Sequence, residues 1–563
     1  MIFKERNFDK DIFNDLVNKG LNPVLSNIFS ARKIQSSSDI EYKLDKLLSP
    51  HLLKSNIDVG KFLMQAIVAK QKIVVVGDYD ADGATATACC VLGLRKFGAD
   101  IDFIVPNRFE FGYGLTPKIV KLASEKSPNI IITVDNGIAS IEGVEEANKL
   151  GITVVVTDHH LPSMQLPNAL YIVNPNQKSC TFPSKSLCGV GVIFYVLLST
   201  RIAFRDSSFF EGRSEPNLAD LLDLVALGTV ADLVPLDFNN RILVKFGLDK
   251  INSNVCNFGI RAILALNKNN KNTKNVKSTD LSFVIAPKLN AAGRLDDMTL
   301  GIQCLLSDNM DSANNLAKKL NAFNEKRKFI EQEMKEKALL ILSEPNIKDS
   351  YSVTMFDPTW HQGVIGILAA RIKEKYYRPT IIFAEGDAGF LKGSGRSIPS
   401  YHLRDALDLI SKRNPNLIHT FGGHAMAIGL TIKSENFKIF SEVFETVSRE
   451  LIQKEDLNFI VEVDKEIPSS FFNYETAKVI NSQIWGQGFP APIFFGTFDV
   501  LDQKVIAEKH TKCILYNKNK YNAIFFNSIQ RLPDRISIGY SVDANEFNNK
   551  KSLQIIIKNL NDV

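Results

Sequence analysis

The stretch KIVVVGDYDADGATATACC, residues 72–90, joins an apolar strand pattern directly to a cluster of acids. Residues 73–77 are apolar and mostly β-branched, which is typical of a strand buried on both faces of a parallel sheet. Asp78, Asp80 and Asp82 follow within five residues, although three like charges so close together repel one another. The residues after them have a helical pattern. Since ligands of open parallel sheets bind at the carboxyl ends of the strands, the stretch predicts an α/β domain with a site at this edge.

The same arrangement recurs farther along the chain. Further strand-like apolar runs lie at 102–106, 129–134, 152–157 and 169–174. Polar groups directly follow two of these runs, namely Asp135 after the second, and Asp158, His159 and His160 after the third. Asp232 is another candidate, because it interrupts the apolar run LVALGTVADLVPL. We therefore expect these acids and imidazoles to converge at one edge of the sheet.

Converging carboxylates need cations, because repulsion and burial would otherwise raise their pKa values and neutralise them. A mixed set of carboxylates and neutral imidazoles suits Mn²⁺, and Mg²⁺ is the harder alternative. Two such ions, about 3.5–4 Å apart, can clamp a phosphoryl group. Each residue alone has an ordinary explanation, such as a helix N-cap, a surface histidine pair or a buried hydrogen-bonded acid. Their recurrence on successive strands favours the metal site.

The composition is that of an ordinary globular protein, with 45% hydrophobic and 23% charged residues over a length of 563. At roughly 100–200 residues per domain, this length predicts three to five domains. The formal net charge is only +5, so any nucleic-acid surface is expected to be a local patch. The first residues lack the apolar segment of a signal peptide, and the longest apolar run, 188–198, is too short to span a membrane. The seven cysteines contain no CxxC pair, which favours a reducing, cytoplasmic location.

The remaining sequence changes character several times. Short amphipathic helical patterns occupy residues 1–65, and 185–305 are mostly helical. A charged stretch without Gly or Pro, 312–343, predicts one long helix. A second α/β pattern starts near residue 351 and ends near 455. The tail from 458 holds short strand-like runs separated by turn signals, beginning with FIVEVD, which predicts a small barrel.

The motifs GDYDADG, VDNG, TDHH and GTVADLVPL, in that order, resemble the four signature motifs of the DHH phosphoesterase family. Within this family the chain is similar to the single-stranded-DNA-specific 5′→3′ exonucleases. PNRFEFGYGL, LCGVGVIFYVL, PKLNAAGRLDD, WHQGVIGILAARIKEKYYRP, GSGRSIPSYHL and FGGHAMAIGL carry this closer resemblance, which covers nearly the whole chain.

The resemblance implies an α/β fold with two α/β domains joined by a long helix, plus a C-terminal OB-fold β-barrel. The expected domains are an N-terminal helical segment (1–65), a DHH catalytic domain with a parallel sheet (66–305), a connecting helix (306–347), a DHH-associated substrate-binding domain (348–457) and the OB-fold domain (458–563). OB folds bind single strands through basic grooves and stacked aromatic residues.

The resemblance also implies roles for individual residues. Expected metal ligands are Asp78, Asp80, Asp82, Asp135, His159 and Asp232, with Asp135 bridging two ions. Many relatives carry a histidine where this chain has Val76, and Asp78 is the candidate to replace it. Asp158 is expected to orient its neighbours, while His160 is expected to face the scissile phosphate. The sequence leaves open which of the two histidines binds metal.

Candidate substrate contacts are Arg108, Arg294, Ser394, Arg396 and His424, and each arginine could instead make a structural ion pair. In GSGRS, Ser394 and Arg396 offer a hydroxyl and a guanidinium fork to a terminal 5′-phosphate, and the glycines are expected to bring backbone amides close to it. His424 follows two glycines, where a histidine could also be a plain turn residue.

The family therefore implies a metal-dependent exonuclease that degrades single-stranded DNA 5′→3′ to 5′-mononucleotides with two Mn²⁺ or Mg²⁺ ions, in DNA recombination and repair. The expected partners are a single-strand-binding protein and a helicase, and the expected state is a monomer without membrane attachment. The alternative is a phosphodiesterase for short oligonucleotides or cyclic dinucleotides, against which the C-terminal barrel argues. A non-catalytic scaffold is the third hypothesis. The filled ligand positions argue against it.

Overall fold

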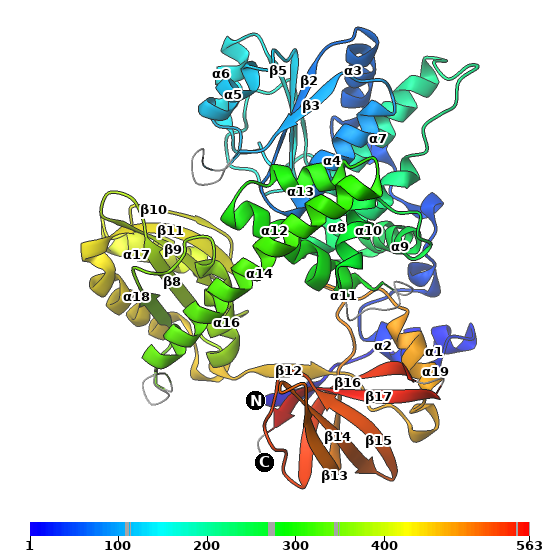
Figure 1. Ribbon diagram of the computed structural model, residues 1–563, viewed down its shortest axis with the longest axis vertical. Coiled ribbons are helices and arrows are strands. Elements are labelled where there is room, and N and C mark those ends of the chain that lie inside the picture. The colour runs from blue at the N-terminus through cyan, green and yellow to red at the C-terminus, as the bar shows by residue number, and fades with distance from the viewer. Residues whose placement is uncertain are drawn as a thin grey trace. The chain divides into compact units, whose positions relative to one another are not determined.

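The computed structural model describes residues 1–106, 112, 114–267, 276–342, 347, 349–547 and 550–561. The chain forms two compact units. The larger unit comprises residues 5–323 and 463–563, and the smaller unit comprises 1–4 and 324–462. The long helix α14 (Met310–Ile341) begins in the larger unit and ends in the smaller one (Figure 1). None of the helices in the described ranges is long and apolar enough to cross a membrane.

A five-stranded parallel sheet organises the first part of the larger unit. Its strands run in the order β3 (Ile101–Ile104), β2 (Ile73–Gly77), β4 (Ile130–Val134), β5 (Thr153–Thr157) and β6 (Tyr171–Val173). Every residue of β2 and β4 is buried, as their unbroken Val/Ile runs predict. The predicted parallel sheet is therefore confirmed.

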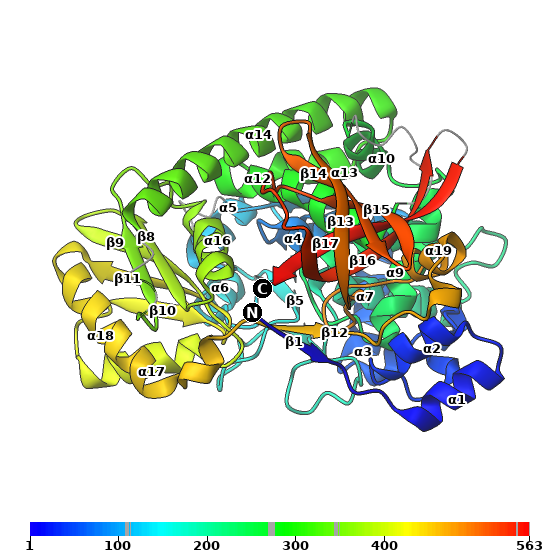
Figure 2. The ribbon, with the colours of Figure 1, turned by 90° about the horizontal axis from the view of Figure 1, so that it is seen from below.

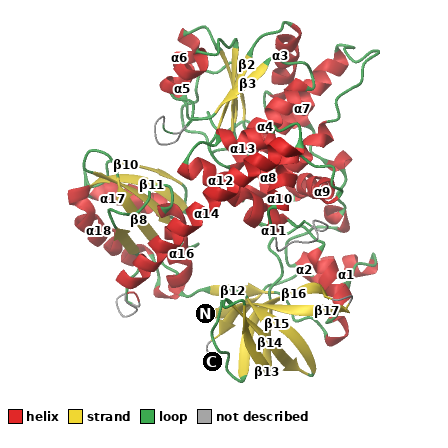
Figure 3. Ribbon diagram, in the orientation of Figure 1, coloured by secondary structure: helices red, strands yellow, loops and turns green. Residues whose placement is uncertain are grey.

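Alternate residues of the strands pack on opposite faces of this sheet. Val74 and Val76 of β2 face α5 (Pro117–Ser124) and α6 (Ile141–Lys149). Val75, between them, belongs to the core on the other side, which α4 (Ala81–Arg95) and α7 (Gly189–Asp206) cover. Figures 1 and 3 show the sheet between these two layers of helices. Because helices cover both faces of the sheet, polar side chains can lie only where the strands end.

Helices extend the core beyond α7. They are α3 (Asn56–Val68), α8 (Leu222–Ala231), α9 (Phe238–Asn252), α10 (Phe258–Ala265), α11 (Ser278–Asp280), α12 (Ala286–Leu295) and α13 (Thr299–Leu305). A π-helical turn, η5 (Leu281–Ile285), leads directly into α12. α8 packs against α4, α7 and α9, so the predicted helical region shares one core with the sheet.

The C-terminal part of the larger unit is a closed barrel. Its strand order is β13 (Phe494–Ile506), β14 (His510–Asn517), β15 (Asn519–Phe525), β17 (Lys550–Asn561) and β16 (Arg535–Phe547). Helix α19 (Tyr474–Asn481) packs on β16 and β17. This barrel confirms the OB-fold prediction. The inclusion of FIVEVD among its strands was wrong, because that run forms β12 (Ile460–Val463), which pairs with β1 (Ile2–Glu5).

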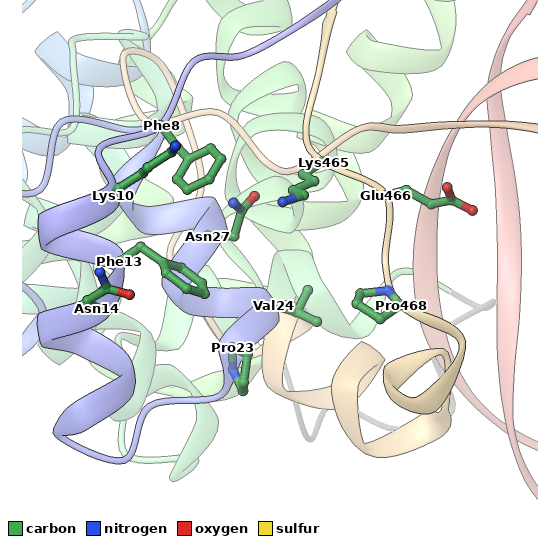
Figure 4. Close-up of a pocket in the computed structure, with 10 residues that line it drawn as sticks. All are labelled: Phe8, Lys10, Phe13, Asn14, Pro23, Val24, Asn27, Lys465, Glu466 and Pro468. Atoms are coloured by element: carbon green, nitrogen blue, oxygen red, sulfur yellow. The ribbon is translucent and has the colours of Figure 1, made fainter.

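Two N-terminal helices border the segment that leads to the barrel. α1 (Lys10–Asn18) and α2 (Pro23–Ser30) pack together, and a pocket of about 300 Å³ lies between them and residues 465–468. Figure 4 shows the rings of Phe8 and Phe13 at this pocket. The strand β1 that precedes these helices was not predicted, because its sequence, IFKE, contains only two apolar residues and so no strand-like apolar run.

The smaller unit is a second α/β domain. Its sheet has the order β10 (Thr420–Gly423), β11 (Ala427–Lys433), β9 (Phe390–Arg396), β8 (Thr380–Glu385) and β7 (Val353–Phe356). One face packs on α17 (Leu403–Arg413) and α18 (Phe437–Leu451), and the other on α16 (Ile365–Tyr376) and α14 (Figure 2). Only β7 and β8 pair in parallel, so the sheet is mixed.

A buried ion pair ties α2 to the start of the barrel region. The Arg32 guanidinium donates to both oxygens of Asp464 at 2.5 and 2.9 Å, and both side chains are 1% exposed. Arg32 also donates to the carbonyl of Pro490 and lies over the ring of Trp485. We predict that Asp464→Asn lowers the free energy of unfolding by about 3–5 kcal/mol, because it leaves a buried guanidinium without its counter-charge.

The measurement is urea unfolding followed by the fluorescence of Trp485. Replacing the other tryptophan, Trp360, by Phe in all variants isolates this signal. The control is Asp249→Asn, which breaks the exposed pair between Lys245 and Asp249 and should cost less than about 1 kcal/mol. Equal effects of the two substitutions would contradict the structural role of the buried pair.

Candidate metal centre

The acids that follow the strands of the parallel sheet meet at its carboxyl edge. Among the described residues there are three groups of three whose possible ligand atoms lie within 4.8 Å of one another. They are Asp78, Asp80 and Asp135; Asp82, His159 and Asp232; and Asp135, His159 and His160. All seven predicted acids and imidazoles of the metal and phosphate site thus belong to one cluster.

The three acids in the loop after β2 are each held in place by different hydrogen bonds. Asp78 accepts a hydrogen bond from the backbone N–H of Tyr79 at 2.7 Å. Asp80 is the N-cap of α4 and accepts from the N–H of Gly83 at 3.0 Å. Asp82 accepts from the first N–H groups of α7, those of Gly189 and Val190, at 2.6 and 3.0 Å. Asp80 is therefore both a helix cap and a candidate ligand, so the two interpretations do not exclude one another.

Asp135 occupies the centre of the cluster in a strained conformation. Its φ is +62°, a region that non-glycine residues rarely adopt and that is common at functional sites. Its side chain is buried, and its Oδ1 lies 3.1 Å from Nε2 of His159. A Cβ on Gly189 would lie 2.5 Å from the Asp135 side chain, so glycine is required for α7 to begin here. The strained backbone of Asp135 and the absence of a side chain at Gly189 thus keep this carboxylate in place.

The two adjacent histidines have different surroundings. Nε2 of His159 lies 3.5 Å from Asp232 and 4.0 Å from Asp82, in addition to its contact with Asp135. Nδ1 of His160 instead bonds to Oδ1 of Asp158 at 2.7 Å. The ring of His159 therefore faces the carboxylates of the cluster, whereas the ring of His160 is held by its hydrogen bond to Asp158.

Asp158 is the hub that orients this pair. Its carboxylate accepts from the backbone N–H groups of His159 and His160 at 2.7 and 3.1 Å, and from that of Ile138 at 2.9 Å. Burial alone would raise the pKa of Asp158, but the hydrogen bond and charge of His160 hold it below its usual value. Burial would lower the pKa of His160, yet Asp158 raises it to about 9.

The remaining acids of the cluster repel one another. Burial, followed by the charges of neighbouring aspartates, raises the pKa values of Asp78, Asp135 and Asp232 well above normal. Burial and Asp80 likewise raise the pKa of Asp82 to about 7, against the two hydrogen bonds from α7. A site that is this unfavourable for anions and is built from carboxylate and imidazole donors fits divalent cations.

Of the predicted substrate contacts in the larger unit, Arg294 lies on α12, beside the loop after β2 that carries Asp78, Asp80 and Asp82. Oδ1 of Asn290, one turn earlier on the same helix, accepts from the N–H of Ala81 at 2.8 Å. Arg108 lies outside the described residues. Arg294 thus stands near the acids through its helix, whereas the position of Arg108 stays a prediction.

In the smaller unit, Ser394 and Arg396 lie on the same side of β9, next to the start of α16. Nη1 of Arg396 donates to the Gly395 carbonyl at 2.8 Å and to the Ser394 hydroxyl at 3.3 Å. A Cβ on Gly366, in the first turn of α16, would lie 2.9 Å from that hydroxyl and 3.1 Å from Nη2 of Arg396. A helix N-terminus, a hydroxyl and a guanidinium therefore meet, which is an arrangement suited to an anion.

The expected use of the glycines in GSGRS was wrong. β9 is an interior strand that pairs with both β8 and β11, so its amides belong to the sheet and do not cradle an anion. A Cβ on Gly393 would clash with the Phe383 ring, and one on Gly395 would clash with Ile428. These glycines make room for the core on the opposite face.

His424 is exposed in the turn between β10 and β11, and its N–H donates to the Ala427 carbonyl at 2.8 Å. Ala427 lies opposite Arg396 in the sheet. The histidine therefore stands at the same end of this sheet as the arginine.

Sequence reasoning missed the amides that support the histidines. Nδ2 of Asn176 donates to the His159 carbonyl at 2.6 Å, and Nδ2 of Asn174 donates to that of His160 at 2.9 Å. Both asparagines follow β6, in the sequence VNPN. The signal that could have found them is the same one that revealed the acids, namely polar residues directly after a buried strand.

Comparisons with known proteins agree with this geometry. Residues 72–229 match the family model of the DHH family, N-terminal domain, 348–450 match the DHHA1 domain, and 463–559 match the RecJ OB domain. The single-stranded-DNA-specific exonuclease RecJ of Haemophilus influenzae is 45% identical over 551 residues, which are 95% of this chain and 95% of that relative.

Solved structures are similar over the whole chain. The crystal structure of RecJ from Thermus thermophilus in complex with Mn²⁺ has a TM-score of 0.82 at 26% identity, covering 100% of this chain and 79% of that one. The structure of the same protein in complex with Mg²⁺ has a TM-score of 0.76 at 24% identity, covering 100% and 78%. The chain therefore belongs to the RecJ family of single-stranded-DNA-specific exonucleases, within the wider DHH family.

Proposed function

We propose that this protein hydrolyses single-stranded DNA from its 5′ end and releases 5′-mononucleotides. The observation that carries the proposal is the buried cluster around Asp135, where seven acids and imidazoles converge at the carboxyl edge of the sheet. The relatives' activity and the barrel that matches the RecJ OB domain support DNA as the substrate. The alternative substrates, short oligonucleotides and cyclic dinucleotides, are not favoured by relatives that align over the full length of the chain.

Six residues would hold the ions: Asp78, Asp80, Asp82, Asp135, His159 and Asp232. Two Mn²⁺ or Mg²⁺ ions, when bound, supply Lewis-acid activation of the phosphodiester and of the attacking water. Asp135, which belongs to two of the three ligand groups, is suited to bridge them. His160, with its raised pKa, is suited to donate a proton to the phosphate, and Asp158 keeps its ring turned for that task.

The smaller unit is proposed to hold the 5′-phosphate of the strand. Ser394, Arg396 and the N-terminus of α16 supply the donors, and the exposed His424 lies at the same end of the sheet. In the larger unit, Arg294 and Arg108 are proposed to contact the phosphates beside the metals. Binding the end of the strand separately from the metals would fix which phosphodiester is cut.

The proposed setting is recombination and repair in the cytoplasm. A single-strand-binding protein and a helicase are the proposed partners, since both supply or protect single-stranded DNA, and the proposed state is a monomer. Co-purification of the tagged protein with either partner, and its mass in solution, are the measurements that test these points.

We predict that Asp135→Asn reduces exonuclease turnover by about 10³-fold or more at saturating Mn²⁺, because the central carboxylate is lost while its shape is kept. Binding of a single strand should be nearly unchanged, since the residues proposed to contact the DNA lie elsewhere in the chain. The assay is release of nucleotides from 5′-labelled strands, with anisotropy for binding. The control is Asp220→Asn, a surface acid paired with Lys96, which should retain activity. Normal turnover in the Asp135 variant would contradict the assignment.

We predict that the metal-free protein loses thermal stability as the pH rises from 5.5 to 9. The native state keeps protons on Asp82 up to pH 7 and on His160 up to pH 9, whereas the unfolded chain releases them earlier, so stability falls as pH rises. Mn²⁺ displaces the carboxyl protons and should flatten the aspartate part of this slope.

Calorimetric titration of Mn²⁺ in buffers of different ionisation enthalpy measures the protons released on binding. At pH 6 we expect release of one proton or more, and less at pH 8.5. The Asp82→Asn variant serves as a comparison and should release fewer protons at pH 6. Release that is zero at both pH values would show that the cluster is already ionised without metal.

We predict that Arg396→Lys raises the KM for 5′-phosphorylated strands about 10-fold or more, since a point charge replaces a bidentate fork. Strands with a 5′-hydroxyl should be much less affected. Steady-state kinetics on the two substrates give the comparison. Arg413→Lys, which alters an exposed pair with Glu450 in the same unit, is the matched control. An equal change on both substrates would place the contact of Arg396 away from the terminal phosphate.

A further inference from the structure

An apolar groove of about 360 Å³ lies along helix α7 in the larger unit. Its floor is one side of α7, and its walls come from residues 44–50 and from 217–222, where α8 begins. The α7 residues in the groove recur at helical spacing and so form a single stripe: Phe194, Leu198, Arg201, Ile202 and Arg205. From Phe194 to Arg205 the stripe is about 16 Å long at 1.5 Å per residue. The groove therefore has the length of a short helix.

The walls of the groove are mainly leucines. Leu218 and Leu222 are almost fully buried, whereas Leu44 in the opposite wall is 37% exposed. On the floor, Leu198 and Ile202 are only partly buried. Single apolar residues on a convex surface are common and indicate nothing. A hollow in which several such side chains stay accessible together instead favours a bound apolar partner.

Two arginines stand at one end of the groove, and one of them is incompletely paired. Arg205 donates to both oxygens of Glu215 at 2.8 and 2.6 Å. Nε of Arg201 is buried 3.4 Å from the same carboxylate, and among the described residues no atom accepts a hydrogen bond from it. Burial and the charge of Arg205 lower the pKa of Arg201, although Glu215 opposes them. Two guanidiniums thus share one carboxylate, so Arg201 can take a further anion.

The arginine end of the groove is distant from the candidate metal centre. The N-terminus of α7 holds Asp82 through the N–H of Gly189. Arg201 lies about 18 Å farther along the same helix at 1.5 Å per residue. A partner bound beside Arg201 would therefore leave the carboxyl edge of the parallel sheet open to the DNA strand.

We propose that the groove along α7 binds an acidic amphipathic helix of a partner protein. Apolar side chains three and four residues apart on such a helix would fill the groove between the leucine walls. A carboxylate beside them would pair with Arg201 in a charge-assisted hydrogen bond. A nucleotide suits the groove less well, because apart from the arginines its lining offers only the polar side chains of Ser49 and Asn217 to a base. This docking does not depend on the proposed function.

Fluorescence anisotropy with labelled peptides and the full-length protein tests the proposal. The first probe has leucines three and four residues apart on one face and glutamates beside them, and it is about 16 residues long, since shorter isolated helices are marginal in water. Wild-type protein should bind it with a micromolar Kd that rises as salt is added. A second probe, with serine in place of each leucine, should bind about 10-fold more weakly or worse, because it cannot fill the apolar groove.

Three variants locate the binding site of the first probe. Arg201→Glu should raise the Kd about 10-fold or more, because it places like charges opposite one another. A probe with lysine in place of each glutamate should reverse this order and bind the variant more tightly than the wild type. Leu44→Asp, which alters an exposed position of the wall, should also weaken binding of the first probe. Arg261→Glu is the matched control, because it makes the same charge change at an exposed arginine of α10.

Four results would overturn the inference. They are a first probe that does not bind wild-type protein at millimolar concentration, an Arg201→Glu variant that binds it as the wild type does, displacement of the probe by a 5′-mononucleotide, and a wild-type dimer that Leu44→Asp converts to a monomer. The last two would make a nucleotide or a second copy of the chain the occupant. All variants should degrade short strands at the wild-type rate, and circular dichroism checks their folding independently. Failure of the wild-type protein to degrade strands would overturn the proposed function alone.

Discussion

The structure depends on one electrostatic constraint, the repulsion among buried carboxylates at the carboxyl edge of a single parallel sheet. The pKa values of four of these acids are raised because burial and neighbouring charges both disfavour ionisation. Such an arrangement would be selected against in a purely structural core, since apolar residues would pack there at less cost. It is stable in ionised form only when divalent cations occupy the space between the carboxylates.

The helices around the cluster offset part of this repulsion and leave part of it in place. Asp80 caps the N-terminus of α4, and Asp82 accepts from the N-terminus of α7, so the positive ends of two helix dipoles face these acids. Asp232 is different, because it is the C-cap of α8 and therefore stands at the negative end of a dipole. The helix ends thus favour the ionised forms of Asp80 and Asp82 and disfavour that of Asp232, so the charge on Asp232 depends on a bound cation.

The sequence predicts those features that arise from local order. Continuous Val/Ile runs such as 73–77 give the strands, and because parallel strands share one edge, the acids that follow them had to converge. Contacts between distant segments were beyond this reasoning. Asn290 reaches back to Ala81, and the strand at 460–463 pairs with the N-terminus and not with the barrel, although its pattern is that of a barrel strand. The glycines of GSGRS were misread for the same reason, since the side chains that require them come from β8 and β11.

In the proposed function, the two neighbouring histidines of one short motif have different chemical roles. A metal ligand must offer a lone pair, whereas a donor to phosphate must carry a proton, so identical environments would make one of the two useless. Asp158 resolves this by bonding to Nδ1 of His160 alone and raising its pKa to about 9, while Nε2 of His159 faces the acids. Asp158 stays ionised within the core because the hydrogen bond and charge of His160, together with hydrogen bonds from backbone N–H groups, offset its burial. The first residue of the motif therefore determines what the other two can do.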